Sequence, residues 1–311
     1  MKPFIALSRL QHAVLDIATP AFCALLWLGN FPDSSVIVIS LLTAFSGYTA
    51  IYALNDVIGY TVDKKKMEYS NSCFGYSVES TDLRHPIAQQ VLSYTEGVAW
   101  VMAWIIFALI GAYWLNPIIM LMLLFGAVCE VAYCKLLTVT HWRLVLSGIV
   151  KSVGPIAAVF VVDHNPDPLF LALIFMWVFF WEIGGQNIPA DWNDRSEDIK
   201  VNAKTIPLIF GDKTSKKIVL LSLLLATLLS GFLLIISPLR LGLAYLVLSA
   251  LIGVALLIWP AIKLYLADTI TDQPARLFDL ASYYPLALLL MMVMLIYCNN
   301  YEVAILDWVD N

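Results

Sequence analysis

Charged side chains are scarce in this sequence. Lys, Arg, Asp and Glu make up 13% of the 311 residues, whereas hydrophobic residues make up 61%. Soluble domains are usually about 25% charged and about 45–50% apolar, so this chain cannot cover its surface with polar groups. Its basic residues are dispersed and its net charge is -5. Because nucleic-acid-binding domains carry clustered positive charge, we expect no nucleic-acid partner.

Cysteine and histidine are also few. The five cysteines form no C-x-x-C motif, and most lie in apolar runs, where a thiol packs as a small hydrophobic group. The four histidines, His12, His85, His141 and His164, share no metal-binding spacing. The sequence therefore predicts neither a disulfide framework nor a zinc site, and it assigns the histidines no chemistry.

Long apolar runs recur along the whole chain. A membrane-spanning helix needs about 20 mainly apolar residues, and runs that continue to the C-terminus are not a signal peptide. Nine such runs cover about residues 12–30, 35–58, 92–114, 116–136, 143–162, 169–190, 217–236, 241–266 and 281–300. Little sequence remains for a soluble module. We therefore expect one all-α polytopic membrane domain over residues 1–311.

The basic residues favour one orientation in the membrane. If the N-terminus is cytoplasmic, 16 of the 18 Lys and Arg residues lie on or near the cytoplasmic side, as the positive-inside rule requires. These are Lys2, Arg9, Lys64, Lys65, Lys66, Arg84, Lys135, Arg143, Arg195, Lys200, Lys204, Lys213, Lys216, Lys217, Lys263 and Arg276. We expect a multi-pass protein of a bacterial-type cytoplasmic membrane.

A first polar motif ends the second apolar run. It contains Asn55, Asp56 and Asp63. If the helix continues, Asp56 and Asp63 share one face, with Asn55 and Gly59 beside it at i,i+4 spacing. Residues 64–66 are all lysine, and a basic triplet at a cytoplasmic boundary is what topology alone requires.

A second acidic motif ends the sixth run. Asp191, Asp194 and Asp198 follow one another at intervals of three and four residues, so a helix would carry them as one stripe. Glu182 and Gln186 would extend this stripe by two further steps of four. Both motifs fall on the same predicted side of the membrane, which favours a shared site over two sets of solvated loop residues.

The two motifs predict a magnesium site. Stacked carboxylates repel one another, and carboxylate and amide oxygens suit Mg²⁺, which usually binds through one or two carboxylates plus substrate phosphates. The predicted ligands are Asn55, Asp56, Asp63, Asp191, Asp194 and Asp198. Basic residues on the same side are predicted to bind diphosphate oxygens: Arg84, Lys135, Lys200 and Lys204.

Lys151 is a charged residue within the fifth run. An ionisable side chain inside a membrane span faces a cavity or an acidic partner. The sequence leaves open whether Lys151 pairs with an acidic side chain inside the protein or binds substrate.

These motifs resemble those of the UbiA superfamily of intramembrane prenyltransferases. Asn55, Asp56 and Asp63 match the family pattern N-D-x-x-D-x-x-x-D, and residues 191–198 match D-x-x-D-x-x-x-D, with Thr205 and Pro207 as the T-x-P that follows. Arg84-His85-Pro86-Ile87 looks like the family's basic residue before proline, with one residue inserted. The resemblance implies nine transmembrane helices around a central cavity that opens at the two motifs.

Two features depart from the family pattern. Gly59 stands where the family usually has its middle aspartate, which removes one carboxylate from the first motif. Asp56 would then compensate, or one magnesium ion would be held mainly by the second motif. The stretch 63–84 is longer than usual, and we expect a different lid over the cavity mouth.

The implied reaction is magnesium-dependent transfer of an isoprenyl group from an isoprenyl diphosphate to a lipophilic acceptor, aromatic or not, within the bilayer. The resemblance assigns catalytic roles to Asp63, Asp194 and Asp198. One alternative is a terpene cyclase that uses the same site without an acceptor. Another is a non-catalytic membrane protein that binds or transports lipid, in which Gly59 would mark a decayed metal site.

Overall fold

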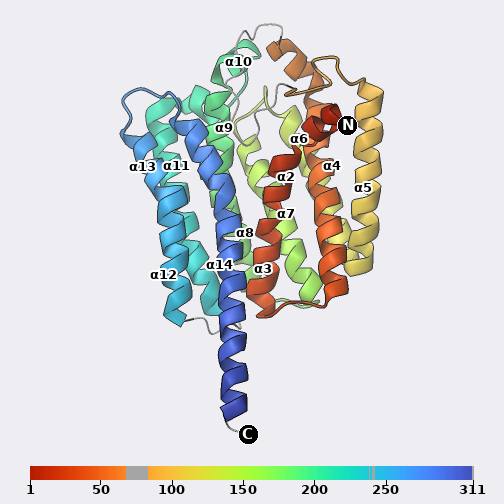
Figure 1. Ribbon diagram of the computed structural model, residues 1–311. Coiled ribbons are helices and arrows are strands. Elements are labelled where there is room, and N and C mark those ends of the chain that lie inside the picture. The colour runs from red at the N-terminus through yellow and green to blue at the C-terminus, as the bar shows by residue number, and fades with distance from the viewer. Residues whose placement is uncertain (68–82, 238, 240–241, 310–311) are drawn as a thin grey trace.

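The computed structural model describes residues 1–67, 83–237, 239 and 242–309, with side chains up to residue 298. Every regular element in these ranges is a helix (Figure 1). The helices are α1 (Lys2–Leu7), α2 (Leu10–Asp16), α3 (Ala18–Leu28), α4 (Ser34–Met67), α5 (Tyr94–Leu115), α6 (Pro117–Lys135), α7 (Arg143–Val162), α8 (Pro168–Trp181), η1 (Glu182–Asn187), α9 (Ile188–Asn193), α10 (Arg195–Lys200), α11 (Ile206–Ile236), α12 (Gly242–Gly253), η2 (Val254–Ile258), α13 (Trp259–Leu266) and α14 (Gln273–Val309).

The nine predicted spans are confirmed within the described residues, where nine helical segments are long and apolar enough to cross a membrane. Their ends differ from the prediction, because polar turns continue the apolar helices into the interface. α4 runs on to Met67, and α11 already begins at Ile206, with Pro207 in its first turn. α14 begins at Gln273. The capping box at Ser93 and Glu96 is present at the start of α5. Most of the predicted lid, residues 68–82, lies outside the described residues.

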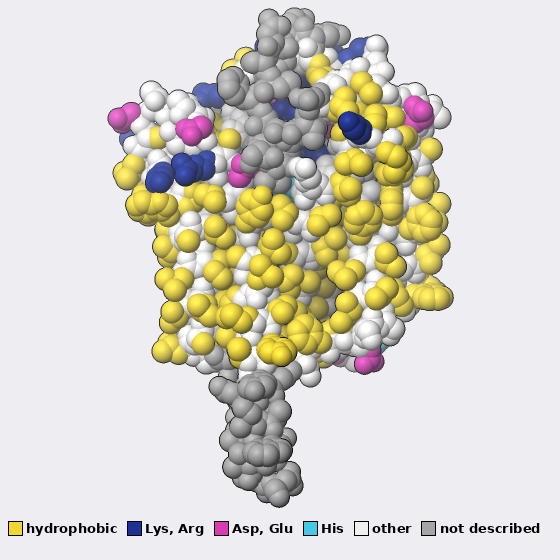
Figure 2. Space-filling view, in the orientation of Figure 1, with side chains coloured by type: hydrophobic (Ala, Val, Ile, Leu, Met, Phe, Trp, Pro, Cys, Tyr) yellow, Lys and Arg dark blue, Asp and Glu magenta, His cyan; other side chains and the backbone are white. Residues whose placement is uncertain are grey.

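The helices form a bundle whose polar end and apolar flank are separate (Figures 1 and 2). The largest buried cluster joins residues of α3, α8, α11 and α14, among them Trp177, Trp181 and Tyr284. Hydrophobic side chains cover the flank of the bundle, whereas Lys and Arg gather near the end where α4 stops and α10 lies. This distribution matches a protein that has lipid as its lateral solvent.

A π-helical turn, η1, interrupts the sixth span. The prediction that Glu182, Gln186 and the second motif form one continuous stripe is wrong, because the wider turn shifts the helical register and a second break separates α9 from α10 at Asp194. Gln186 donates a hydrogen bond to Ser282 on α14 (3.1 Å). Glu182 accepts one from Ser147 on α7 (2.6 Å).

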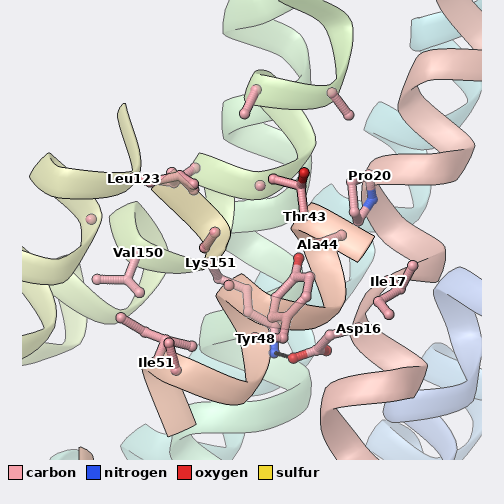
Figure 3. A pocket seen from close by; sticks show the side chains of 18 of the residues that line it. Asp16, Ile17, Pro20, Thr43, Ala44, Tyr48, Ile51, Leu123, Val150 and Lys151 are labelled. Carbon is pink, nitrogen blue, oxygen red and sulfur yellow. Dashed lines mark hydrogen bonds and ion pairs between the residues drawn. The ribbon is translucent and has the colours of Figure 1, made fainter. Parts of the chain in front are cut away.

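A cavity of about 540 Å³ lies inside the bundle (Figure 3). Much of its wall is aliphatic, including Ile51, Leu123 and Val150. Lys151 faces this wall and is also paired, since its Nζ lies 2.6 Å from Asp16 Oδ2. The expectation that Lys151 faces a cavity or an acid is therefore confirmed in both respects.

Candidate active site

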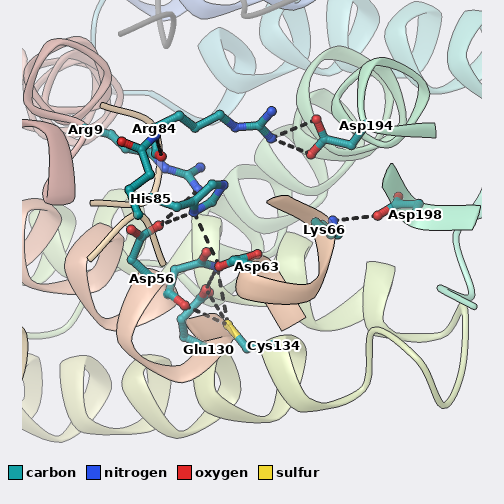
Figure 4. Close-up of polar contacts among 12 residues, drawn as sticks. Arg9, Asp56, Asp63, Lys66, Arg84, His85, Glu130, Cys134, Asp194 and Asp198 are labelled. Carbon is teal, nitrogen blue, oxygen red and sulfur yellow. Dashed lines mark hydrogen bonds and ion pairs between the residues drawn. The ribbon is translucent and has the colours of Figure 1, made fainter. Parts of the chain in front are cut away.

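Asp56 and Asp63 of the first motif meet at His85 (Figure 4). His85 Nδ1 lies 2.8 Å from Asp56 Oδ1 and 3.3 Å from Asp63 Oδ2. The two carboxylates share one face of α4, as their spacing predicts. Burial disfavours a charged imidazole, but Asp63 and Asp56 outweigh it and raise the pKa of His85 above its usual value. These three side chains place ligand atoms within 4.8 Å of one another.

The backbone of His85 has an unusual conformation. Its φ of 58° lies in the left-handed region, which residues with a side chain seldom adopt. Such strain persists where the surroundings hold it and is common at functional sites. The turn also brings the neighbouring Arg84 to the second motif.

Arg84 connects the two motifs. Its Nη2 lies 2.7 Å from both Asp194 carboxylate oxygens. Burial alone would raise the pKa of the Asp194 carboxyl, but Arg84 and then Lys66 lower it to about 2. Asp194 is therefore a carboxylate at neutral pH, next to the first motif.

Lys66 makes a second connection between the motifs. Its Nζ lies 2.6 Å from Asp198 Oδ1, and both side chains are nearly buried. Lys66 thus differs from Lys65, whose side chain is exposed. The interpretation of the triplet as a purely topological signal misses the contact that Lys66 makes.

Two predicted ligands lie against other helices. Asp191 accepts a hydrogen bond from Arg143 on α7 (2.8 Å), and Arg143 stacks over the Tyr133 ring. Asn55 donates to Glu130 on α6 (2.6 Å). These contacts turn Asp191 toward α7 and Asn55 toward α6.

The four predicted diphosphate-binding residues differ in their surroundings. Arg84 is part of the connected site, whereas the side chains of Lys135, Lys200 and Lys204 are exposed. The Lys204 backbone bonds to the loop after α6, with its N 2.7 Å from Leu137 O. These three lysines therefore belong to the surrounding surface of this structure.

Sequence reasoning missed three residues of this site. His85 had no metal-binding spacing, although it stands between Arg84 and Pro86 in the segment that resembles the family's basic motif. Lys66 was hidden among three lysines. Glu130 is an isolated acid in an apolar run, and its position inside a predicted span was the signal that could have found it.

The donor set fits a hard divalent ion. Asp56 and Asp63 place carboxylate oxygens within 4.8 Å of each other and of the His85 imidazole. Arg84 and Lys66 pair with the carboxylates of Asp194 and Asp198 in the second motif. Carboxylate oxygens are the ligands that Mg²⁺ prefers.

The site also adjoins the cavity. Arg9 lines the cavity, and its guanidinium lies 3.8 Å from Asp56 Oδ1. Asn55 lines it as well. A charged group held by the motifs would therefore lie next to a largely apolar space.

In the part of the chain that the structure describes, nine apolar helices carry two connected aspartate motifs at one end of their bundle. They define a multi-pass integral membrane protein with a polar site beside a cavity. Residues 17–283 match the model of the UbiA prenyltransferase family. The chain belongs to this family. No curated protein sequence matches it significantly.

Solved structures share the fold. A UbiA homologue from Aeropyrum pernix K1 in its apo form superposes with a TM-score of 0.68 and 14% identity, over 92% of this chain and 98% of that one. A UbiA homologue from Archaeoglobus fulgidus bound to GPP and Mg²⁺ has a TM-score of 0.64 and 13% identity, over 95% and 99%. A digeranylgeranylglyceryl phosphate synthase has a TM-score of 0.62 and 16% identity, over 95% and 98%.

Proposed function

We propose that this protein transfers an isoprenyl group from an isoprenyl diphosphate to a lipophilic acceptor and depends on Mg²⁺. The observation that supports this most is the connection of both aspartate motifs, through Arg84 and Lys66, beside a cavity of about 540 Å³. The A. fulgidus homologue binds GPP and Mg²⁺, in agreement with the proposal.

The proposed roles follow from position. Asp56, Asp63, Asp194 and Asp198 would hold the magnesium, which when bound neutralises charge on the departing diphosphate. Arg84 and Lys66 would contact the diphosphate oxygens, and Lys135, Lys200 and Lys204 would attract the anion from the surface. The apolar cavity would enclose the isoprenyl chain and keep water from the allylic carbon as it gains cationic character. Asn55 and Asp191 would support the site from α4 and α9.

The motif end of the bundle would face the cytoplasm. The Lys and Arg residues gather at that end of the described structure (Figure 2), in accordance with the positive-inside rule.

The test is incubation of the purified protein with a panel of isoprenyl diphosphates, Mg²⁺ and native lipid extract, followed by mass spectrometry. We expect a prenylated lipid and released diphosphate. A cyclic hydrocarbon formed without extract would instead identify a terpene cyclase. Binding or flux without diphosphate release and without any need for Mg²⁺ would contradict both enzyme functions.

A further inference from the structure

Glu130 is a buried acid on α6 that belongs to neither aspartate motif. Its side chain is 7% exposed and lines the cavity. An acidic side chain within a membrane span is costly, and it is usually paired or functional. Its partner here is on α4, because Glu130 Oε1 accepts a hydrogen bond from Asn55 Nδ2 at 2.6 Å. The contact joins α6 to the first residue of the first motif.

Cys134 supports the same contact. It follows Glu130 by four residues and therefore shares its face of α6. Asn55 Nδ2 lies 3.3 Å from Cys134 Sγ, and this sulfur lies 3.5 Å from Glu130 Oε1 (Figure 4). An ionised carboxylate only accepts hydrogen bonds. The amide nitrogen of Asn55 must therefore face α6, so that its neighbours determine the orientation of the amide.

The amide oxygen of Asn55 is left for another partner. Because Nδ2 is turned toward α6, Oδ1 is turned away from it. In the described part of the chain, the hydrogen bonds of the Asn55 side chain all run through Nδ2. Asn55 is half-buried and lines the cavity, so a small ligand can reach it. Amide oxygens are ligands that hard divalent ions accept.

Asn55 also stands next to the group of potential metal ligands. It directly precedes Asp56, whose Oδ1 lies 2.8 Å from His85 Nδ1. Asn55, Gly59 and Asp63 follow one another at i,i+4 spacing along α4. Gly59 has no side chain, and Asp63 Oδ2 lies only 2.8 Å from the position that a Cβ atom would take there. Asn55 is therefore the next side chain after Asp63 along this strip of the helix.

Glu130 itself lies outside that group. Among the described acidic, histidine and cysteine residues, those with ligand atoms within 4.8 Å of one another are Asp56, Asp63 and His85. The contact of Glu130 with the first motif is instead made to Asn55. Residues that orient a metal ligand commonly affect metal affinity strongly without touching the ion.

We propose that Glu130 is a positioning residue, which holds the Asn55 amide so that Oδ1 stays available as a ligand for the divalent ion of the first motif. The inference rests on the proposed function, because it assigns a role at the metal site of the same reaction. Without Glu130 the amide would be free to turn its NH₂ group toward the ion, and the first motif, which already lacks a carboxylate at Gly59, would lose a further ligand.

Two substitutions at position 130 separate the contact from the charge. Glu130→Asp keeps the charge but shortens the side chain by one methylene, which withdraws it from Asn55. Glu130→Gln keeps the length and an acceptor oxygen but removes the charge. We expect Glu130→Asp to weaken binding of Mn²⁺ about tenfold, as substitution of a residue that orients a metal ligand usually does, and Glu130→Gln to weaken it clearly less.

Mn²⁺ replaces Mg²⁺ in this test because both favour oxygen ligands. Its affinity is measured from the electron paramagnetic resonance signal of free Mn²⁺, with purified protein in detergent. Each protein is titrated with and without an isoprenyl thiolodiphosphate, which is not cleaved. Equal Mn²⁺ affinity in wild type and Glu130→Asp, a larger loss in Glu130→Gln than in Glu130→Asp, or no Mn²⁺ binding by the wild type in either state would overturn the proposal.

A double-variant cycle tests whether Glu130 acts through Asn55. Asn55→Leu should weaken Mn²⁺ binding, and adding Glu130→Asp to it should change the affinity by no more than about twofold, because the group that Glu130 positions is then absent. Additive losses would show that Glu130 acts on the ion independently and would overturn the proposal. If Asn55→Leu does not fold, the comparison of Glu130→Asp with Glu130→Gln decides the question.

Glu182→Asp is the matched control. Glu182 is also a buried glutamate that lines the cavity, but its carboxylate accepts a hydrogen bond from Ser147 on α7 (2.6 Å). Its substitution should leave Mn²⁺ affinity unchanged. An equal loss in Glu182→Asp and Glu130→Asp would show a general effect of shortening a buried acid and would overturn the specific role of Glu130.

Diphosphate release by the wild type, measured with Mg²⁺ and an isoprenyl diphosphate, distinguishes this inference from the proposed function. Mg²⁺-dependent release, together with equal Mn²⁺ affinity in wild type and Glu130→Asp, would leave the transferase function standing and remove the positioning role. The expected pattern of Mn²⁺ affinities without release under any condition would leave the positioning role standing and remove the transferase function.

Discussion

Arg84 and Asp194 are 110 residues apart in the chain, and their contact joins the two motif regions. The guanidinium Nη2 of Arg84 lies 2.7 Å from both carboxylate oxygens of Asp194. Arg84 belongs to the segment after α4, and Asp194 lies at the break between α9 and α10. The contact therefore holds the two motifs together, and we expect a change at either residue to disturb both halves of the proposed diphosphate site.

Asp194→Asn and Asp198→Asn should each reduce diphosphate release by about 100-fold, since both remove charge that stabilises the departing diphosphate through the metal. Release is measured with an isoprenyl diphosphate at saturating Mg²⁺. Asp268→Asn is the control, because Asp268 is exposed between α13 and α14. Full activity in both motif variants would remove the second motif from the mechanism.

Lys66→Gln should lower diphosphate release at least about tenfold, whereas Lys65→Gln should change it little. The first leaves the buried Asp198 without its ion-pair partner, and an uncompensated buried charge is costly. The second removes an exposed lysine, for which screening by water makes a charge worth little. If the two substitutions change diphosphate release equally, Lys66 has no role in the site beyond its positive charge at the membrane boundary.

Gly59→Asp should lower the Mg²⁺ concentration for half-maximal activity by roughly tenfold, because carboxylate count tunes affinity for divalent ions. A Cβ at Gly59 would meet the Asp63 carboxylate, with its Oδ2 at 2.8 Å, and that flexible end can move aside. Gly59→Asn is the matched control of the same shape without the charge. Asp56→Ala should raise the Mg²⁺ requirement if Asp56 replaces the missing carboxylate. If Gly59→Asp and Asp56→Ala both respond to Mg²⁺ as the wild type does, the idea that Asp56 replaces the carboxylate missing at position 59 has no support.

Lys151→Met should destabilise the protein by about 3–5 kcal/mol, the usual cost of removing one partner from a buried ion pair. Asp16 would lose the ammonium that lies 2.6 Å from its carboxylate. The double variant with Asp16→Asn should recover part of the loss. Thermal unfolding of wild type, both single variants and the double variant measures the coupling, and strictly additive losses would show that the pair contributes nothing.

Cysteines introduced at Lys65 and Asn202, in a background without the five native cysteines, should label only from the cytoplasmic side. Lys65 lies in the last turn of α4 and Asn202 follows α10, so both positions are at the motif end. A cysteine at Asn165, in the connection between α7 and α8, should label only from outside. The opposite pattern would invert the proposed orientation.

The number of spans and the positions of both motifs could be predicted from the sequence. Apolar run length reports burial in lipid directly, since every spanning helix satisfies its backbone within itself. Spacing along α4 placed Asp56 and Asp63 on one face for the same local reason. The resemblance to the family pattern predicted, in addition, that the two motifs form one site.

Contacts between distant segments were decided only by the tertiary structure. His85 meets Asp56 and Asp63 because an unusual backbone turn at φ 58° redirects its side chain, and no spacing rule describes that turn. Lys66 and Lys65 are adjacent lysines, yet only the packing of α4 against α10 buries one beside Asp198. The π-turn η1 interrupts the continuous α-helix that was expected through Glu182 and Gln186. Gly184 and Gly185 let it pack closely, because a Cβ there would meet Leu223 on α11 or Ala281 on α14. Local periodicity is encoded by neighbours in the chain, whereas helix register and side-chain pairing depend on which helices pack together.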